Sequence, residues 1–272
     1  MKVFISADME GISGIHNRTC IIQGEPDYVR GRHLMTADVN AAVEGLLAVG
    51  ADEILINDSH GNMDNILIEE LNPAASLISG SLKMGGMMTG LDESFAAVVL
   101  LGYHSMAGTR GLMAHTISGK HFAEIRVNGN PFGESALSAA IAGYFGVPVI
   151  AASGDDHLCA ELKQMLPWVE FAQVKKGVSN RAAELLSLEK AHQAISAAVG
   201  RGLERLSQKT LFSVTAPLEI ELRLMTPAMA DAASYLLGVR RLDGVHVAYT
   251  APDILSANNM IRGIVSTLSS LG

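Results

Sequence analysis

The sequence predicts an α/β protein: a three-layer αβα domain around a mostly parallel sheet, followed by a smaller two-layer α+β domain. Short apolar runs at residues 3–5, 53–56, 96–101 and 147–152 alternate with segments of helical spacing, which is the pattern of βαβ units. Most of these runs are almost continuously apolar, as expected for parallel strands buried on both faces. Residues 217–224 instead alternate strictly, which indicates an antiparallel strand with one solvated face.

The composition is that of a globular protein with a large core. The 272 residues are 49% hydrophobic and 18% charged, so disorder is not expected. A net charge of -8 without a basic stripe argues against nucleic-acid binding. Two cysteines without metal-binding spacing suggest a reducing compartment. Because neither a signal peptide nor a membrane-spanning run is recognisable, we expect a cytoplasmic protein that does not bind membranes.

The first half of the chain is expected to form the first βαβ units. In chain order, we expect a strand at 3–5, a surface loop at 12–32, a helix from an N-cap at Thr36 to Val49, a strand at 53–56, a short helical segment at 62–71, a short strand at 77–78 and a strand at 96–101. The methionine-rich loop at 83–88 has two open interpretations. It either fills gaps in a core or interface, or forms a lid or substrate wall.

The second half is expected to complete the sheet and then change character. We expect a strand at 121–127, a tight turn at Asn128-Gly129, a helix at 136–143, a strand at 147–152, a helix at 157–166, a strand at 171–174 and a helix at 188–203 capped by Ser187. The tail should contain a strand at 217–224, a helix at 227–236, a strand at 245–249 and a helix at 251–268. This predicts a metal-binding catalytic α/β domain at 1–204 and a smaller βαβα domain at 205–272.

Side chains that can bind metals recur where predicted strands end. Asp8 and Glu10 follow the first strand, His60 follows the second, and His104 follows the strand at 96–101. Since ligands of open α/β sheets bind beyond the carboxyl ends of the strands, these residues should meet in one crevice. Glu134, at the start of a predicted helix, is a fifth candidate. Solvated acids at a strand end, core histidines and a plain helix-start acid are the alternatives.

Three carboxylates and two imidazoles are too many ligands for one tetrahedral zinc ion. They suit two divalent ions about 3.5–4 Å apart, bridged by a carboxylate and a hydroxide. The mixed nitrogen and oxygen set favours zinc, with manganese or cobalt also compatible. A bridging water that loses its proton would be the nucleophile, and the second ion could hold a free amine.

His115 lies in the loop after the strand at 96–101 and is the candidate catalytic residue. It could act as base and acid, stabilise an oxyanion, attack directly, or simply bond to the backbone. Asp155 and Asp156 are either a solvated turn or partners that orient a ligand histidine. A serine triad at Ser59 is disfavoured because the G-x-S-x-G elbow is missing.

Several motifs together carry a family resemblance. In chain order they are Asp8-Met9-Glu10-Gly11-Ile12-Ser13-Gly14, Asn57-Asp58-Ser59-His60, Leu77-Ile78-Ser79-Gly80, Gly102-Tyr103-His104, Met113-Ala114-His115 and Gly133-Glu134. A chain with this series resembles the zinc-dependent D-aminopeptidases, peptidase family M55 of the DppA type, over nearly its whole length. The resemblance implies two zinc ions per subunit, held by Asp8 as the bridging ligand and by Glu10, His60, His104 and Glu134.

The resemblance also implies an activity and an assembly. His115 matches the assigned catalytic nucleophile, although a metal-activated water assisted by His115 is at least as easy to defend physically. The family releases N-terminal D-amino acids, notably D-alanine, from short peptides, and its members form decameric rings. Two alternatives stay open: the same site acting on L- or β-peptides, and a noncatalytic dipeptide-binding protein.

Overall fold

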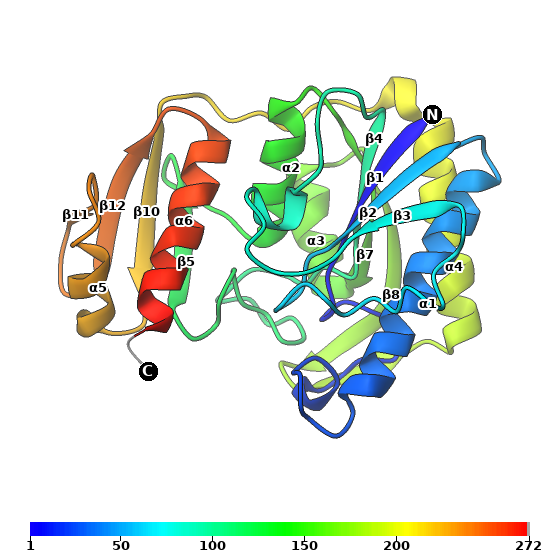
Figure 1. The fold of residues 1–272 in the computed structure, drawn as a ribbon, viewed down its shortest axis with the longest axis horizontal. Coiled ribbons are helices and arrows are strands. Elements are labelled where there is room, and N and C mark those ends of the chain that lie inside the picture. Colours follow the sequence, from blue (N-terminus) through cyan, green and yellow to red (C-terminus); the bar gives the residue numbers. More distant parts are fainter. Residues whose placement is uncertain (271–272) are drawn as a thin grey trace.

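The computed structural model describes residues 1–270, whose strands form two separate sheets (Figure 1). The larger sheet contains β1 (Lys2–Ala7), β2 (Glu53–Asp58), β3 (Ala75–Ile78), β4 (Ala97–Leu101), β7 (Val149–Asp155), β8 (Glu170–Ser179) and β9 (Ala182–Leu185). The strand order is β3-β2-β1-β4-β7-β8-β9, and only β8 and β9 pair antiparallel. The predicted α/β class with a mostly parallel sheet is therefore confirmed.

Helices cover both faces of this sheet, as the three-layer prediction requires. They are α1 (Tyr28–Leu47), α2 (Glu134–Tyr144), α3 (Asp156–Met165) and α4 (Leu188–Glu204). Alternate residues of β1 point to opposite faces, so Val3 and Ile5 join the core under α1 and α4, whereas Phe4 joins the core on the α2 side. Ser187 caps α4 as predicted, since its side chain accepts a hydrogen bond from the Lys190 amide.

The second sheet is antiparallel and has the strand order β11-β12-β10-β5-β6. Its strands are β5 (Phe122–Val127), β6 (Asn130–Pro131), β10 (Leu218–Leu224), β11 (Arg240–Arg241) and β12 (His246–Ala251), and α5 (Pro227–Ala233) and α6 (Ile254–Ser269) accompany them. The strict alternation of 217–224 corresponds to β10, whose apolar residues are buried. The division of the chain at residue 205 stays a prediction, and the second sheet combines strands from both sides of it.

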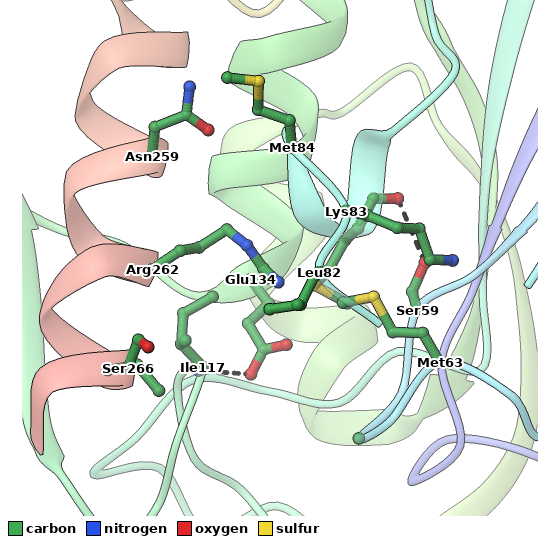
Figure 2. A pocket seen from close by; sticks show the side chains of 13 residues that line it. Ser59, Met63, Leu82, Lys83, Met84, Ile117, Glu134, Asn259, Arg262 and Ser266 are labelled. Atoms are coloured by element: carbon green, nitrogen blue, oxygen red, sulfur yellow. Dashed lines mark hydrogen bonds between the residues drawn. The ribbon is translucent and has the colours of Figure 1, made fainter. Parts of the chain in front are cut away.

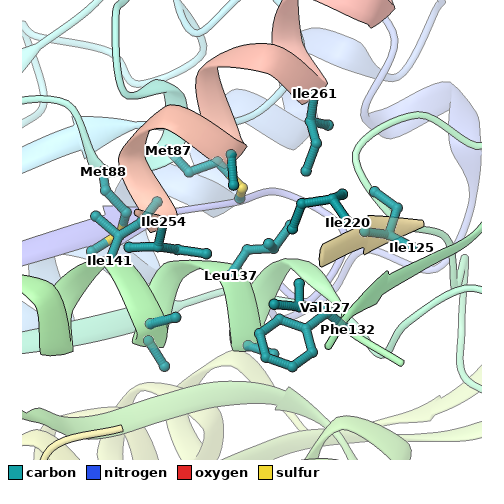
Figure 3. Packing of buried hydrophobic residues seen from close by; sticks show 14 of the residues in the cluster. Met87, Met88, Ile125, Val127, Phe132, Leu137, Ile141, Ile220, Ile254 and Ile261 are labelled. Carbon is teal, nitrogen blue, oxygen red and sulfur yellow. The ribbon is translucent and has the colours of Figure 1, made fainter. Parts of the chain in front are cut away.

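A shared apolar core joins the second sheet to the first. Figure 3 shows α2 and α6 on either side of this core, with Leu137 and Ile141 from α2 facing Ile254 and Ile261 from α6. Among the described residues, none of the helices is both long and apolar enough to cross a membrane.

The first helix begins earlier than predicted. It starts at Tyr28, so the loop expected at 12–32 is shorter and also contains a 3₁₀ turn at Arg18–Cys20. Thr36 lies inside the helix, where its hydroxyl donates to the Arg32 carbonyl at 2.9 Å, and it is not an N-cap. Gly31 lies in the first turns of the helix despite its low helix propensity, because a Cβ there would lie 1.9 Å from the Cys20 carbonyl oxygen.

The helical segment expected at 62–71 is wrong, because these residues form turns. The Asp58 carboxylate accepts hydrogen bonds from the backbone amides of Asn65 and Ile66 at 2.6 and 2.8 Å. The Arg32 guanidinium binds the Asn65 carbonyl at 2.8 Å. Tertiary hydrogen bonds therefore replace the ladder that a helix would have formed.

The strand predicted at 171–174 extends to Ser179 and turns back into β9. The pattern of apolar residues could not predict this extension, because several of its residues are polar. One of them, Lys175, is fully buried and turns out to support the site described next.

Candidate active site

Four of the predicted site residues follow the carboxyl ends of three adjacent strands. Asp8 and Glu10 follow β1, His60 follows β2, and His104 follows β4. Because β1 lies between β2 and β4, the direction in which the chain adds strands reverses at β1. A crevice forms at such a switch point in open α/β sheets, and it is where these side chains meet.

The structure brings all five predicted metal ligands together. His60 Nδ1 lies 3.2 Å from Asp8 Oδ1 and 3.0 Å from Glu10 Oε2. His104 Nε2 lies 3.5 Å from Asp8 Oδ2 and 3.2 Å from Glu134 Oε1. Each of the two triads, Asp8–Glu10–His60 and Asp8–His104–Glu134, has its ligand atoms within 4.8 Å of one another. Asp8 belongs to both triads, so its carboxylate lies between two potential metal positions. Glu10, His104 and His115 form a further group within the same distance limit.

Backbone carbonyl groups fix the tautomers of the two histidines. His60 Nε2 donates to the Ile21 carbonyl at 2.8 Å, and His104 Nδ1 donates to the Ser105 carbonyl at 3.0 Å. In the neutral ring, the opposite nitrogen then carries a lone pair and faces the carboxylates. Such a hydrogen bond on the far nitrogen is what orients most metal-binding histidines in proteins.

The cluster contains buried polar atoms that a cation would satisfy. Of the five buried side-chain atoms without a hydrogen-bond partner among residues 1–270, three are Asp8 Oδ2, Glu10 Oε2 and His104 Nε2. Each of these atoms has a lone pair, and each faces another acceptor of the cluster. Since buried acceptors this close repel one another, protons or metal ions must lie between them. The residues present therefore fit a divalent metal, and the nitrogen and oxygen donor set fits zinc.

The electrostatics of the cluster agree with a cation requirement. Burial and the charge of Glu10 raise the pKa of Asp8 to about 7. Burial opposes a charged imidazole at His60 and His104, but the surrounding carboxylates hold the pKa values of both rings well above the usual range. Without metal the cluster thus retains protons, which a divalent ion would displace.

His115 lies against the cluster but contacts it differently from the predicted ligands. Its Nδ1 donates to the Met113 carbonyl at 2.9 Å, so the neutral ring presents the Nε2 lone pair, 3.7 Å from Glu134 Oε1 and 3.9 Å from Glu10 Oε1. Burial and the neighbouring His104 lower the pKa of His115. Met113 and Ile117 have φ angles of 52° and 61°, a conformation that is uncommon for residues other than glycine. The loop holds the ring in place at the cost of this backbone strain.

The loop that carries Glu10 is held by a buried lysine that the sequence did not reveal. Lys175 Nζ donates to the carbonyl oxygens of Glu10, Ile12 and Ile15 at 2.7, 2.7 and 2.6 Å. Burial lowers the pKa of Lys175 to about 8, so the ammonium is still charged at pH 7. Its three donors satisfy the carbonyl groups of Glu10 and Ile15 and add a second hydrogen bond to the Ile12 carbonyl, which also accepts from the Ile15 amide. Lys175 is thus the support beneath Glu10.

A comparison with known proteins identifies the family. The protein-family model described as peptidase M55, D-aminopeptidase, matches residues 1–263. The chain belongs to the M55 family. A curated D-aminopeptidase of Bacillus subtilis strain 168 is 36% identical over 261 residues, which cover 94% of each chain. The predicted metallo-aminopeptidase is therefore confirmed at the level of the family.

A solved structure supports the fold of this M55 peptidase independently. The Zn-dependent D-aminopeptidase DppA from Bacillus subtilis, described as a self-compartmentalizing protease, superposes with a TM-score of 0.96 at 32% identity. The match covers 99% of this chain and 98% of that chain. Both sheets and their arrangement are therefore shared with that enzyme.

Two cavities of this M55 peptidase contain residues of the cluster. The smaller, of about 330 Å³, is lined by Glu10, His60 and His115 together with exposed residues of neighbouring loops. The larger, of about 660 Å³, is lined by Glu134, by the methionine-rich loop and by α6 (Figure 2). The larger cavity therefore gives access to the cluster between the loops of the first sheet and α6, which packs on the second sheet.

The two interpretations of the methionine-rich loop apply to different residues. Met87 and Met88 are buried in the core, whereas Met84 and Leu82 are 81% and 97% exposed. Met84 and Leu82 line the larger cavity, as Figure 2 shows. The buried Met87 and Met88 thus anchor the C-terminal end of the loop, whereas its N-terminal part forms a wall of the larger cavity.

The two acids at 155–156 do not bind a ligand histidine. Asp155 caps α3 by accepting from the Leu158 amide at 2.9 Å, and it also accepts from the Leu112 amide at 2.8 Å. Asp156 accepts from the Gly177 amide at 2.7 Å and contacts its neighbour His157. Their hydrogen bonds tie the loop before His115 and the strand β8 to the end of β7.

Proposed function

We propose that this protein is a dinuclear zinc aminopeptidase that removes N-terminal D-amino acids, preferably D-alanine, from short peptides. The observation that carries the proposal is the position of Asp8, which belongs to both ligand triads. One zinc ion would be held by Asp8, Glu10 and His60, and the other by Asp8, His104 and Glu134. Membership of the M55 family and the name of the DppA relative support the choice of metal and substrate.

The zinc ions, when bound, would lower the pKa of water and polarise the scissile carbonyl group. The chain itself supplies the geometry. The carbonyl groups that fix His60 and His104 hold their ligand nitrogens in place before metal arrives, so little is lost in ordering them. With zinc bound the carboxylate charges are neutralised, and the free amine at the N-terminus of a peptide would be a ligand for the second ion.

His115 is proposed to move protons in the reaction. Its neutral ring accepts a proton at Nε2 from the attacking water and donates it to the leaving amine nitrogen as the C–N bond breaks. The hydrogen bond from Nδ1 to the Met113 carbonyl stabilises the ring when it is transiently charged. This role suits a histidine whose pKa is lowered by burial. Direct attack by His115 would instead form a covalent intermediate, which distinguishes the two mechanisms.

Hydrolysis of matched dipeptides tests the function. The zinc-loaded protein should hydrolyse D-Ala-D-Ala, with L-Ala-L-Ala and a β-alanine dipeptide turned over far more slowly, and chelation should abolish activity. Faster hydrolysis of the L- or β-peptide would change the substrate class. Equal rates with and without metal would remove zinc from the mechanism, and binding without turnover would leave a peptide-binding protein.

We also propose that the protein is a cytoplasmic homo-oligomer, a decameric ring like those expected for the family. The DppA relative is described as self-compartmentalizing. Tyr235 and Leu237, which follow α5, are 87% and 96% exposed, and large apolar side chains of this kind are typical of interfaces. Both cysteines are free thiols, as expected in a reducing compartment. Light scattering after gel filtration should give ten subunit masses, and a monomer would contradict the assembly.

A further inference from the structure

The larger cavity beside the cluster contains an arginine that the catalytic scheme does not use. Arg262 lies on α6, which packs with the second sheet, and Glu134 begins α2. Both side chains line the same cavity of about 660 Å³. Figure 2 shows the Arg262 side chain leaving α6 and extending into this space, toward the side where Glu134 and Leu82 lie. A positive charge from α6 therefore faces the space next to the cluster.

The guanidinium of Arg262 has no partner within the described part of the chain. None of residues 1–270 accepts a hydrogen bond from it or forms an ion pair with it, although the side chain is half-buried. Lys83, the other cation of this cavity, differs: its Nζ donates to Asn57 Oδ1, to the Asp58 carbonyl and to the Ile78 carbonyl at 2.8, 2.7 and 3.1 Å. All three donors of Lys83 are used, so Arg262 is the cation that can bind a ligand.

A glycine makes room for the guanidinium in this position. Gly86 has a φ of 60°, and a Cβ there would lie 2.6 Å from Arg262 Nη1. Any other residue at position 86 would displace the end of the arginine. Burial against this backbone also lowers the pKa of Arg262 from its ordinary value, although the group stays charged. A half-buried charge without a partner is costly to maintain, and an anionic ligand would offset that cost.

We propose that Arg262 binds the C-terminal carboxylate of the peptide substrate, so that the larger cavity takes the residue on the leaving side of the scissile bond. The inference rests on the proposed aminopeptidase function. A planar guanidinium binds a carboxylate through two parallel hydrogen bonds, which also fixes its orientation. A short peptide of uncharged residues carries one such group, at the end opposite to its N-terminal amine.

The walls of the cavity agree with this occupant. Met63, Met84, Ile117 and Val265 surround the space with apolar surface, which suits a small apolar side chain on the leaving residue. Since the carboxylate is bound at a fixed place, peptides of the matching length benefit and longer ones do not. The preference for short peptides would then reside on α6, apart from the metal ligands.

Kinetics with a substrate and its C-terminal amide test the proposal. The zinc-loaded protein should hydrolyse D-Ala-D-Ala with a kcat/KM about 10- to 100-fold above that for D-Ala-D-Ala amide, the range expected from hydrogen bonds to a charged group. R262M should lose this factor for the free acid, mainly in KM, and leave the amide unchanged. R262K should retain part of the preference, and R223M, which changes an exposed arginine on β10, should behave as the parent protein.

Binding measurements separate this inference from the proposed function. Calorimetry would use a reduced-bond analogue of D-Ala-D-Ala, which cannot be hydrolysed, and the C-terminal amide of that analogue. Weaker binding of the amide to the parent protein, and no such difference for R262M or R262Q, supports Arg262 even if no peptide were hydrolysed. Equal losses for acid and amide in the variants, or no preference in the parent protein, would overturn the role of Arg262 while leaving hydrolysis itself unaffected.

Discussion

The imidazole rings of His104 and His115 are stacked, with centroids 4.1 Å apart and planes inclined by only 9°. One ring follows β4, and the other belongs to the strained loop between β4 and β5. The stack sets the position of His115 Nε2 relative to the acids, and it places a neutral ring beside a proposed ligand. Positioning and proton transfer are thus linked through this one contact.

The first prediction concerns His115. H115A should keep its zinc and lose about 10²- to 10⁴-fold in kcat, the usual contribution of a general acid–base group. Metal content by elemental analysis and kcat with D-Ala-D-Ala are the two measurements. H33A is a matched control, since His33 is exposed and pairs with Glu70 on the surface. A full rate in H115A would remove His115 from the mechanism, and loss of zinc would make it a ligand.

The second prediction concerns metal and stability. Asp8, Glu10 and Glu134 are buried beside one another, so removing zinc should leave a buried cluster that must take up protons to limit the repulsion between its carboxylates. Chelation should lower the unfolding free energy, and readdition of zinc at about 100 times its Kd should restore about 2.7 kcal/mol for each zinc site. H60A and H104A should bind less zinc and respond weakly to chelator. Urea unfolding curves that are identical with and without zinc would contradict the metal site.

The third prediction concerns the lysine beneath Glu10. K175M removes the donor to three buried carbonyl groups and should cost about 3–5 kcal/mol of unfolding free energy. Because one of these carbonyls belongs to Glu10, zinc affinity should fall as well. K176M changes the exposed neighbour on the same strand and should match the parent protein in urea unfolding and zinc titration. Unchanged zinc affinity in a folded K175M would show that Glu10 does not need this support.

The fourth prediction concerns pH. His192 of α4 lies 3.2 Å from the buried Asp38 of α1, and this carboxylate raises the pKa of His192. A raised pKa in the folded state stabilises the protein below the unfolded value of about 6.5, and this stabilisation is lost as pH rises through the folded value. H192Q should therefore destabilise zinc-loaded protein by roughly 0.5–1 kcal/mol at pH 5.5 and by less at pH 8.5. Urea unfolding at the two pH values measures this difference, and equal losses would exclude the charged pair.

The fold class and the site residues could be predicted because both depend on local signals. Buried parallel strands are continuous apolar runs, and the functional side chains follow directly after them, as Asp8 and His104 do. The start of α1 could not be predicted, since Gly31 is required by a close contact with the Cys20 carbonyl that the spacing of apolar residues does not reveal. The turns at 62–71 depend in the same way on the Asp58 carboxylate.

Residues that act through three-dimensional contacts were the ones missed. Lys175 lies in a polar stretch that predicts an exposed strand end, yet the fold buries it under the Glu10 loop. Arg262 is the single charged residue of α6, and only the cavity shows what its side chain faces. The spacing of residues along the chain predicts which face of a strand or helix a side chain occupies. The roles of Lys175 and Arg262 depend instead on which other segments their side chains contact or face in the folded protein.

The cavity wall formed by α6 has a consequence for how enzymes with this fold can diverge. The proposed metal ligands come from loops of the first sheet and from α2, whereas α6 comes from the last part of the described chain. Substitutions on one face of a single helix could then change which peptides are accepted without disturbing the reaction chemistry. Relatives with identical metal-binding residues need not share substrate preferences. The side chains at the positions of Arg262 and Val265 are where such a difference is expected.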